Sequence, residues 1–304
     1  MRRGLLSLAV VAACLAAGAA GATSTATIPA RSAVTALAAD GTDVSFATTP
    51  SASDCDRVFV WQTSLRKPVQ LGKKQRCKSK TLGITALTVT KGRALWMTGT
   101  ASSPATLRLW TAATTRTTPK ALGTATRDVQ ANEPLPIVVG TAGGGLLPYA
   151  MGAAVAVLRS NGTSFQWSAP ARVIALAARG GRVAVASEGS RVTVLDGRGN
   201  VVSVDLFSSE VSAVAMTAKG LLVQRGTTLE LRRESDAHEY TMTGAAQLDD
   251  ADSKWAAWSD GRTVHVIRLP DGSSVATYPG TSAAFAGTTL YVANGKTVTS
   301  RTIR

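Results

Sequence analysis

A strand–turn–strand unit recurs along most of the chain, and this repeat is the feature that most constrains how the chain can fold. In each copy an apolar segment rich in small residues leads to a tight turn, which two strands of alternating apolar and polar residues follow. The clearest copy runs from Val173 to Leu206, with turns at Arg179-Gly180-Gly181 and Glu188-Gly189-Ser190. Alternation with period two, interrupted by glycine and aspartate turns, is typical of β-strands rather than helices. We therefore predict an all-β protein.

The spacing of the copies predicts how the strands are grouped. Equivalent residues recur at intervals of 35 to 51 residues; they are Ala36, Ala86, Ile137, Ala175, Ala213, Leu248 and Ala284. A period of roughly 40 residues with four strands per unit is typical of the blades of a β-propeller. Seven blades fit residues 23–304 as a single domain; six or eight blades, a β-sandwich array and a solenoid are the alternatives. The last unit lacks an outer strand, and we expect Thr25 to Pro29 to supply it and close the ring.

One blade motif allows a comparison with known propellers. The unit from Val264 to Val275, with its turn at Pro270-Asp271-Gly272, resembles the blades of secreted bacterial β-propellers of the WD40-like, TolB-like and quinoprotein-like groups. The resemblance covers nearly all of residues 30–304 and implies the architecture, since any strand–turn–strand blade produces such motifs. No unit ends in the Trp-Asp dipeptide of standard WD40 repeats. The calcium or quinone ligands of some relatives have no clear counterpart here, so the resemblance implies no cofactor.

The N-terminal segment has the pattern of a secretion signal. Arg2-Arg3 precedes an apolar stretch from Gly4 to Ala20, and Ala20-Gly21-Ala22 places small residues before a cleavage site. We expect residues 1–22 to be removed, leaving a mature chain without a membrane span that is secreted or associated with the cell envelope. Two other interpretations stay open. A lipobox-like sequence ending at Cys14 would make that cysteine a lipid anchor, and the paired arginines loosely resemble a twin-arginine signal.

Two cysteines follow the signal segment. Cys55 and Cys77 lie symmetrically about residue 66, where we expect a turn between strands at Arg57 to Trp61 and Pro68 to Leu71. Because the hairpin would bring the two thiols opposite one another in an oxidising compartment, we predict a Cys55–Cys77 disulfide. Such a bond contributes about 3 kcal/mol in the chain-entropy model. Two free buried thiols are the alternative.

Basic residues dominate the charge of the chain, which has a formal net charge of +14. One run contains seven basic residues and no acidic one: Arg66, Lys67, Lys73, Lys74, Arg76, Lys78 and Lys80. We expect this run to bind anionic partners in a salt-dependent way, such as an envelope polymer, acidic lipid headgroups or an acidic protein. Nucleic acid is a further anionic candidate, but the absence of interleaved aromatic residues argues against base-stacking recognition of single strands. The alternative is that these lysines protect an exposed edge strand from pairing with other chains.

The sequence offers few bases for nucleophilic catalysis, since His238 and His265 are its only histidines. A serine-type mechanism needs a base held against a nucleophile. We expect His265 to be a partly covered residue of the alternating strand at Thr263 to Ile267, and His238 to lie in a solvated, charged loop. Neither residue is assigned a catalytic role.

Two further segments contain residue types that occur in metal or phosphate sites. Asp249, Asp250 and Asp252 are expected to form a turn, where aspartate is favoured for backbone reasons, with a weak cation site as the alternative. Gly143 to Gly145 lacks the Lys-Ser/Thr that follows a phosphate-binding loop and is expected to be a flexible connection. No metal ligand is assigned.

These observations predict an exported, non-catalytic and monomeric β-propeller scaffold. It would bind a protein or an anionic ligand in the cell envelope or outside the cell, without a cofactor. The alternative is a propeller enzyme, a hydrolase or lyase, with its site in the central channel. Innermost segments rich in Ala, Val, Leu and Thr favour packed blades and a binding role. Several carboxylates at a channel mouth would instead favour the enzyme.

Overall fold

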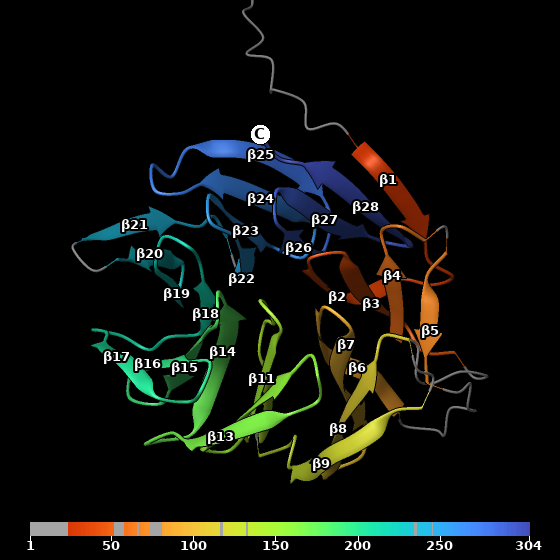
Figure 1. Ribbon diagram of the computed structural model, residues 1–304, viewed down its shortest axis with the longest axis horizontal. Coiled ribbons are helices and arrows are strands. Elements are labelled where there is room, and N and C mark those ends of the chain that lie inside the picture. The colour runs from red at the N-terminus through yellow and green to blue at the C-terminus, as the bar shows by residue number, and fades with distance from the viewer. Residues whose placement is uncertain are drawn as a thin grey trace, which may run out of the picture.

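The chain forms a ring of β-sheets. The computed structural model describes residues 24–51, 58–65, 67–72, 81–115, 118–131, 133–233, 236–244 and 246–304. These residues form seven four-stranded antiparallel sheets, which are the blades of a propeller around a central axis (Figure 1). This part of the chain contains no helix, and so none that could cross a membrane. The prediction of an all-β, seven-bladed propeller is confirmed.

In six blades the strands follow chain order from the axis outwards. Blade 1 consists of β2 (Val34–Asp40), β3 (Asp43–Thr48), β4 (Val58–Gln62) and β5 (Val69–Leu71). Blade 2 consists of β6 (Thr81–Thr90), β7 (Arg93–Thr100), β8 (Ala105–Ala113) and β9 (Lys120–Arg127). Blade 3 consists of β10 (Ile137–Val139), β11 (Leu146–Met151), β12 (Ala154–Arg159) and β13 (Ser164–Ser168). Blade 4 consists of β14 (Val173–Arg179), β15 (Arg182–Ser187), β16 (Arg191–Asp196) and β17 (Val201–Leu206). Blade 5 consists of β18 (Ala213–Met216), β19 (Leu221–Arg225), β20 (Thr228–Arg232) and β21 (Ala237–Thr241). Blade 6 consists of β22 (Gln247–Ala251), β23 (Trp255–Ser259), β24 (Thr263–Arg268) and β25 (Ser274–Pro279).

Blade 7 joins the two ends of the described chain. From the axis outwards it consists of β26 (Ser282–Ala286), β27 (Thr289–Asn294), β28 (Thr297–Thr302) and β1 (Ser24–Pro29). β1 pairs antiparallel with β28, so that Ile28 faces Val298. The predicted closure by an N-terminal outer strand is therefore confirmed.

The core lies between the blades rather than at one centre. The described residues form seven apolar clusters, and each cluster joins two neighbouring blades. Phe46 of blade 1 and Tyr291 of blade 7 belong to one cluster, for example. Because a blade has a neighbour on both faces, the strands second from the axis are covered on both sides: every residue of β3 and β23 is buried. The outer strands β13 and β21 alternate between exposed and half-buried residues instead.

Polar side chains link neighbouring blades near the axis. The Asp43 carboxylate of blade 1 accepts a hydrogen bond from the Gly92 N–H of blade 2 at 2.8 Å. The Gln224 amide of blade 5 accepts one from the Leu248 N–H of blade 6, also at 2.8 Å. Backbone N–H groups that lie between sheets need such partners when they are buried.

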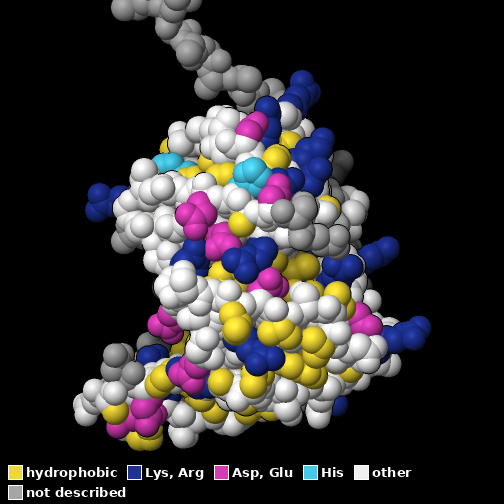
Figure 2. Space-filling model, turned by 90° about the vertical axis from the view of Figure 1, so that its left-hand side faces the viewer, with side chains coloured by type: hydrophobic (Ala, Val, Ile, Leu, Met, Phe, Trp, Pro, Cys, Tyr) yellow, Lys and Arg dark blue, Asp and Glu magenta, His cyan; other side chains and the backbone are white. Residues whose placement is uncertain are grey.

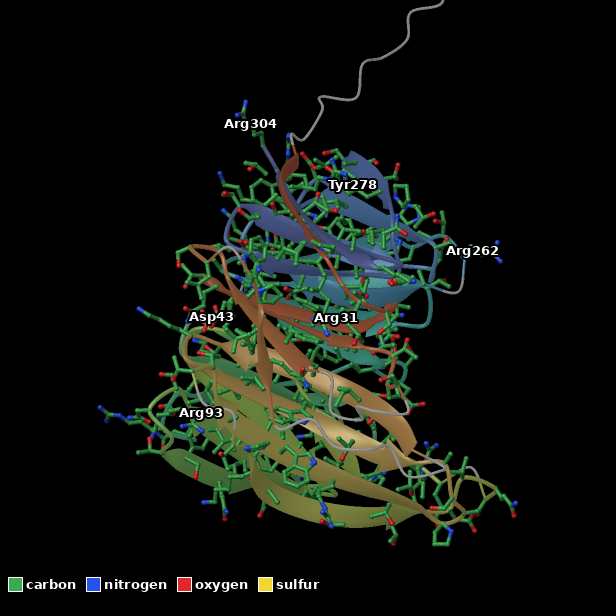
Figure 3. All side chains as sticks on the ribbon, turned by 90° about the vertical axis from the view of Figure 1, so that its right-hand side faces the viewer. Arg31, Asp43, Arg93, Arg262, Tyr278 and Arg304 are labelled. Atoms are coloured by element: carbon green, nitrogen blue, oxygen red, sulfur yellow. The ribbon has the colours of Figure 1, made fainter. Side chains whose placement is uncertain are left out.

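The ring has two faces. The innermost strands begin at one face and end at the other. Figure 3 views the ring from its side and places Asp43 and Arg93 toward one face and Arg262 toward the other. Arg93 begins β7, directly after the turn that ends the innermost strand β6. Arg262 lies between β23 and β24. We call the face of Asp43 and Arg93 the C-terminal face, because innermost strands end there, and the face of Arg262 the N-terminal face.

The closure of the ring predicts a large effect from a single residue of β1. Ile28 is 6% exposed and packs in the cluster between blades 7 and 1. We expect Ile28→Ala to lower the free energy of unfolding by about 2–4 kcal/mol, because it removes buried methylene groups from that cluster. Denaturant unfolding followed by tryptophan fluorescence measures the change. Thr27→Ala, an exposed position on the same strand, is the matched control and should change stability by less than about 0.5 kcal/mol.

Candidate functional site

The central channel of the ring contains two cavities. Its widest part is a cavity of about 460 Å³ at the N-terminal face. Residues of five innermost strands line it, and most are apolar, including Ile137, Val173 and Leu248. Its polar lining includes Arg172, which pairs with the Glu188 carboxylate, and Asp249. Pockets of this size and composition suit an apolar side chain or a small ligand.

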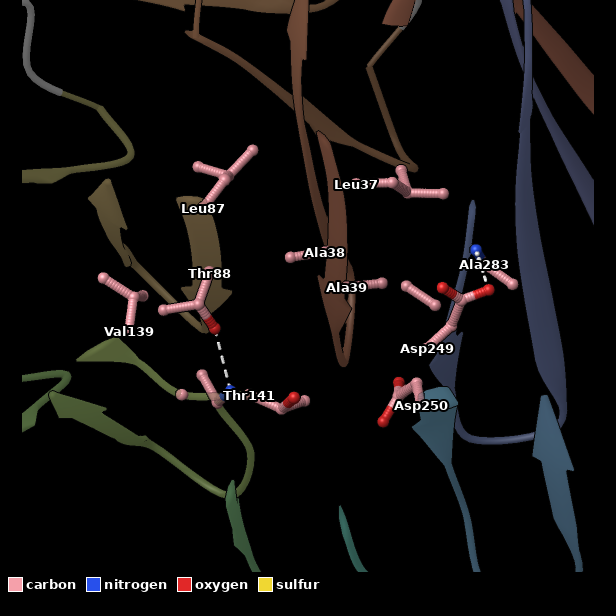
Figure 4. A pocket seen from close by; sticks show the side chains of 13 residues that line it. Leu37, Ala38, Ala39, Leu87, Thr88, Val139, Thr141, Asp249, Asp250 and Ala283 are labelled. Atoms are coloured by element: carbon pink, nitrogen blue, oxygen red, sulfur yellow. Dashed lines mark hydrogen bonds between the residues drawn. The ribbon is translucent and has the colours of Figure 1, made fainter. Parts of the chain in front are cut away.

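A smaller cavity of about 120 Å³ lies deeper in the channel (Figure 4). Asp249 and Asp250 contribute the carboxyl groups of its lining, which also contains apolar residues such as Leu37 and Leu87. Both aspartates belong to β22, the innermost strand of blade 6. The prediction that they form a turn is wrong, and only Asp252 lies beyond the end of the strand.

A bulge explains why two consecutive carboxyl groups reach the same neighbour. The register of β22 and β23 shifts between Leu248 and Asp250, so Asp249 is the extra residue of the ladder. The Asp249 carboxyl accepts hydrogen bonds from Ser259 Oγ at 3.0 Å and from the Ala283 N–H at 3.2 Å. The Asp250 carboxyl accepts one from the Phe285 N–H at 2.8 Å. Ala283 and Phe285 lie on β26, so both carboxyl groups tie blade 6 to blade 7.

An arginine from a distant blade completes this network. Arg179 ends β14 of blade 4, and its guanidinium lies 2.9 Å from the Asp252 carboxylate and 3.8 Å from that of Asp250. Blade 5 lies between blades 4 and 6 in the ring, so the ion pair links two blades that are not neighbours. It lies at the C-terminal face, where β14 and β22 end.

Desolvation controls the ionisation of both channel carboxyls. It raises the pKa of Asp249 to about 8, although the bonds from Ser259 and Ala283 act in the opposite direction. It raises the pKa of Asp250 to about 6, where the charge of Arg179 is the main opposing influence. Both groups therefore change protonation between weakly acidic and weakly alkaline pH, whereas ordinary aspartates ionise near pH 4.

The bonding of these carboxyls links blade 6 to blade 7. Each of the four oxygens accepts a hydrogen bond from within the propeller, since Asp250 also accepts one from the Ala251 N–H. The one hydroxyl among these donors, that of Ser259, belongs to β23 of the same blade and donates its hydrogen bond to Asp249. In the described part of the chain, no three His, Cys, Asp or Glu side chains are placed to hold a metal ion together.

The two histidines lie far from the axis, on strands β21 and β24. His265 is half-buried on β24 and stacks on the Trp258 ring with 5.5 Å between centroids, which confirms the expected partly covered sheet residue. His238 was predicted in a loop and instead lies on β21, the outer strand of blade 5. Its Nε2 contacts the Arg233 guanidinium and lies 3.3 Å from the Asp236 carboxylate. The turn is shorter than its charged sequence suggested, because β21 begins at Ala237.

The predicted flexible glycine connection is packed against the next blade. Thr141 donates its N–H to the Leu176 carbonyl at 3.1 Å and accepts the Ala178 N–H at 2.8 Å, which bridges blade 3 to β14 of blade 4. A Cβ atom at Gly143 would lie 2.5 Å from the Ala178 carbonyl oxygen. The glycines therefore permit a close approach of two backbones, and the prediction of a flexible connection is wrong.

Most of the predicted anion-binding run lies outside the described residues, as do the predicted signal segment, Cys14, Cys55 and Cys77. The members of the run outside them are Arg66, Lys73, Lys74, Arg76, Lys78 and Lys80. Lys67 is described and is exposed. It precedes β5, the outer strand of blade 1. The disulfide and the anion-binding surface stay predictions.

Comparison with known proteins identifies the fold. No protein-family model matches the chain, and no curated protein sequence matches it. A solved structure of the mitotic checkpoint complex contains a chain with 11% identity and a TM-score of 0.60, where the match covers 99% of this chain and 100% of that one. The β-propeller domain of Cps50 (Swd1) from Myceliophteria thermophila has 12% identity and a TM-score of 0.59, with 93% and 100% covered. Raptor from Chaetomium thermophilum has 14% identity and a TM-score of 0.58, with 92% of this chain and 28% of that one covered.

These similarities agree with the seven-bladed β-propeller fold described above. At such low identity they concern the fold alone, since this architecture carries many functions. The chain spans a little over a quarter of the length of the Raptor chain, which contains other regions as well.

The raised pKa values predict how stability depends on pH. The folded protein holds protons on Asp249 and Asp250 that the unfolded chain, with a pKa near 3.8, releases. Their contribution to stability is therefore full below about pH 4 and is lost as pH rises through about 6 and then about 8. We expect Asp249→Asn to remove the upper part of this loss and to stabilise the protein at pH 8 by on the order of 1–2 kcal/mol.

Thermal unfolding between pH 4 and pH 9 measures this effect. Asp271→Asn is the control, because hydrogen bonds from Ser273 lower the pKa of that exposed carboxyl and its influence is confined to acidic pH. A pH profile of Asp249→Asn that parallels the wild type would contradict the assignment.

Proposed function

We propose that the protein is an exported, non-catalytic propeller scaffold that binds an anionic polymer of the cell envelope through the basic residues between Arg66 and Lys80. The observation that carries this proposal is the run of seven basic residues without an acidic one between Arg66 and Lys80. It adjoins β5, the outer strand of blade 1.

The distribution of buried charge supports a basic surface. Several carboxylates are buried, namely Asp43, Glu230, Asp250 and Asp252, whereas no lysine or arginine of the described residues is buried. The surface is therefore more positive than the formal net charge of +14 suggests. A field of this sign raises the local concentration of anions and accelerates their association.

The sequence pattern of the N-terminus supports export. Arg2-Arg3, the apolar stretch from Gly4 to Ala20 and the small residues that follow it have the order of a secretion signal. The blade motif at Val264 to Val275 resembles those of secreted bacterial propellers, including TolB-like ones. In this proposal the mature chain begins at Thr23, and lipid anchoring at Cys14 is the alternative.

A channel enzyme is the second candidate. The pair of desolvated carboxyls at Asp249 and Asp250 favours it, since carboxyls with raised pKa values serve as general acids in many active sites. Structural networks also shift pKa values, however, and all four oxygens here accept hydrogen bonds from blades 6 and 7. The scaffold therefore accounts better for the channel.

Binding of the mature protein to its own envelope fraction across a salt series tests the proposal. We expect the affinity to fall steeply with salt, and the variant with Lys73, Lys74, Lys78 and Lys80 changed to Glu to lose binding by tenfold or more, because four attractions become repulsions. Protease treatment of the envelope fraction should leave binding intact if the ligand is a polymer and abolish it if the ligand is an acidic protein.

A variant of equal net charge provides the control. Lys91, Lys219, Arg262 and Lys296 are exposed residues in turns of four other blades. Changing all four to Glu lowers the net charge equally but leaves the run intact. Equal loss of binding in both variants would show that net charge alone acts and would contradict a site on blade 1.

Peptide mapping of the exported protein without reduction tests the export and disulfide predictions together. We expect an N-terminal peptide that begins at Thr23 and a linked pair of peptides that contain Cys55 and Cys77, since oxidation is favoured outside the cytoplasm. A lipid-modified N-terminal Cys14 would instead support the anchored form. Two separate peptides with free thiols would contradict the disulfide.

A further inference from the structure

The outer strand of blade 4 differs from the outer strands of the other blades. The described residues contain eight exposed large hydrophobic side chains, and four of them lie on β17: Val201, Val202, Val204 and Leu206. Their exposed fractions range from 43% to 68%. Figure 2 faces the side of the ring where β17 lies in Figure 1, and hydrophobic side chains gather there into a patch. Contiguous exposed apolar side chains commonly mark interaction sites.

β17 also lacks the features that protect other edges. It is the last strand of its sheet, so no described strand pairs with its outer side. Lys120 and Arg127 bound β9, and Pro279 ends β25, whereas β17 contains no lysine, arginine or proline. Its one charged residue, Asp205, lies 3.6 Å from the Arg232 guanidinium of blade 5. An apolar edge without such protection is a template for pairing with another strand.

The sequence around β17 is complementary to itself. In the antiparallel register that places Val204 opposite Val204 of a second copy, Val202 lies opposite Leu206, and Ser203 lies opposite Asp205. These pairs match apolar with apolar side chains and a hydroxyl donor with a carboxylate. Cross-strand pairs of this kind contribute about 0.2–1 kcal/mol each.

The charges beyond the two ends of β17 follow the same symmetry. The turn before β17 carries Arg198, and the segment after it carries Glu210; both are exposed. Neither side chain forms an ion pair with a described residue. A two-fold axis at Val204 brings Arg198 of each copy to the end where Glu210 of the other copy lies. The two contacts are equivalent, as an isologous interface requires.

We propose that β17 is a self-association edge, through which two copies of this chain pair antiparallel about a two-fold axis at Val204. The two fourth blades then form one continuous eight-stranded sheet. This assembly differs from the monomer expected from the sequence. A six-residue strand buries less area than stable dimers usually need, so the dimer is weak and forms at high protein concentration.

A charge-swap cycle tests the proposal and its register. Sedimentation equilibrium of the full mature protein over a wide concentration range should show a monomer–dimer equilibrium. Arg198→Glu and Glu210→Arg should each weaken dimerisation about tenfold, because two attractive contacts become repulsive. The double variant Arg198→Glu/Glu210→Arg should restore it, since both contacts become attractive again. Both positions are exposed, so the fold should be retained, which thermal unfolding verifies.

A second pair of variants tests the apolar part of the edge. Val202→Lys/Val204→Lys should abolish the dimer, whereas Ser274→Lys/Thr277→Lys adds the same charge to exposed positions of the outer strand β25 and should not. A monomer at every concentration would overturn the proposal. Dimerisation that survives lysines in β17, or that the double charge swap fails to restore, would overturn it as well.

Discussion

Apolar packing between neighbouring blades is the interaction on which the whole structure depends. No blade has a core of its own, because each four-stranded sheet buries both faces against its neighbours. A blade at an open end would leave one apolar face in water, at a cost of roughly 25 cal/mol for each Å². Ring closure is therefore required for stability, and β1 provides it by joining the first described residues to the last strand, β28.

The same packing explains the chemistry of the channel. Innermost strands that lie close together exclude water. Polar groups between them therefore need a hydrogen bond or an ion pair, and another blade supplies it. Asp249 and Asp250 accept hydrogen bonds from N–H groups of β26, and Arg179 of blade 4 lies 3.8 Å from the Asp250 carboxylate. Desolvation makes these carboxyls resemble catalytic acids, as their raised pKa values show. Their hydrogen bonds place them instead among the links that hold the ring together.

The outer strands are where one blade can differ from another without affecting the ring. Their outer edges contact no other described strand, so sequence there is free to serve solubility or recognition. Charged residues and proline bound several of them, for example Lys120 in β9 and Pro279 in β25. The basic run beside β5 and the apolar edge of β17 are the two departures from this pattern, and they differ in chemistry. The basic run suits an anionic ligand, whereas the apolar edge of β17 suits pairing with another β-strand.

The sequence by itself determined the strands, their grouping and the ring. Period-two alternation and regularly placed turns are local signals, and the missing outer strand of the last unit predicted closure by β1. Only the tertiary structure decided where Asp249, Asp250 and Gly143 act, because a bulge in β22 and the backbone of β14 place them. Their partners Ala283, Phe285 and Ala178 lie more than 30 residues away in the chain. Contacts between blades depend on the packing of whole sheets, which no local pattern of residues encodes.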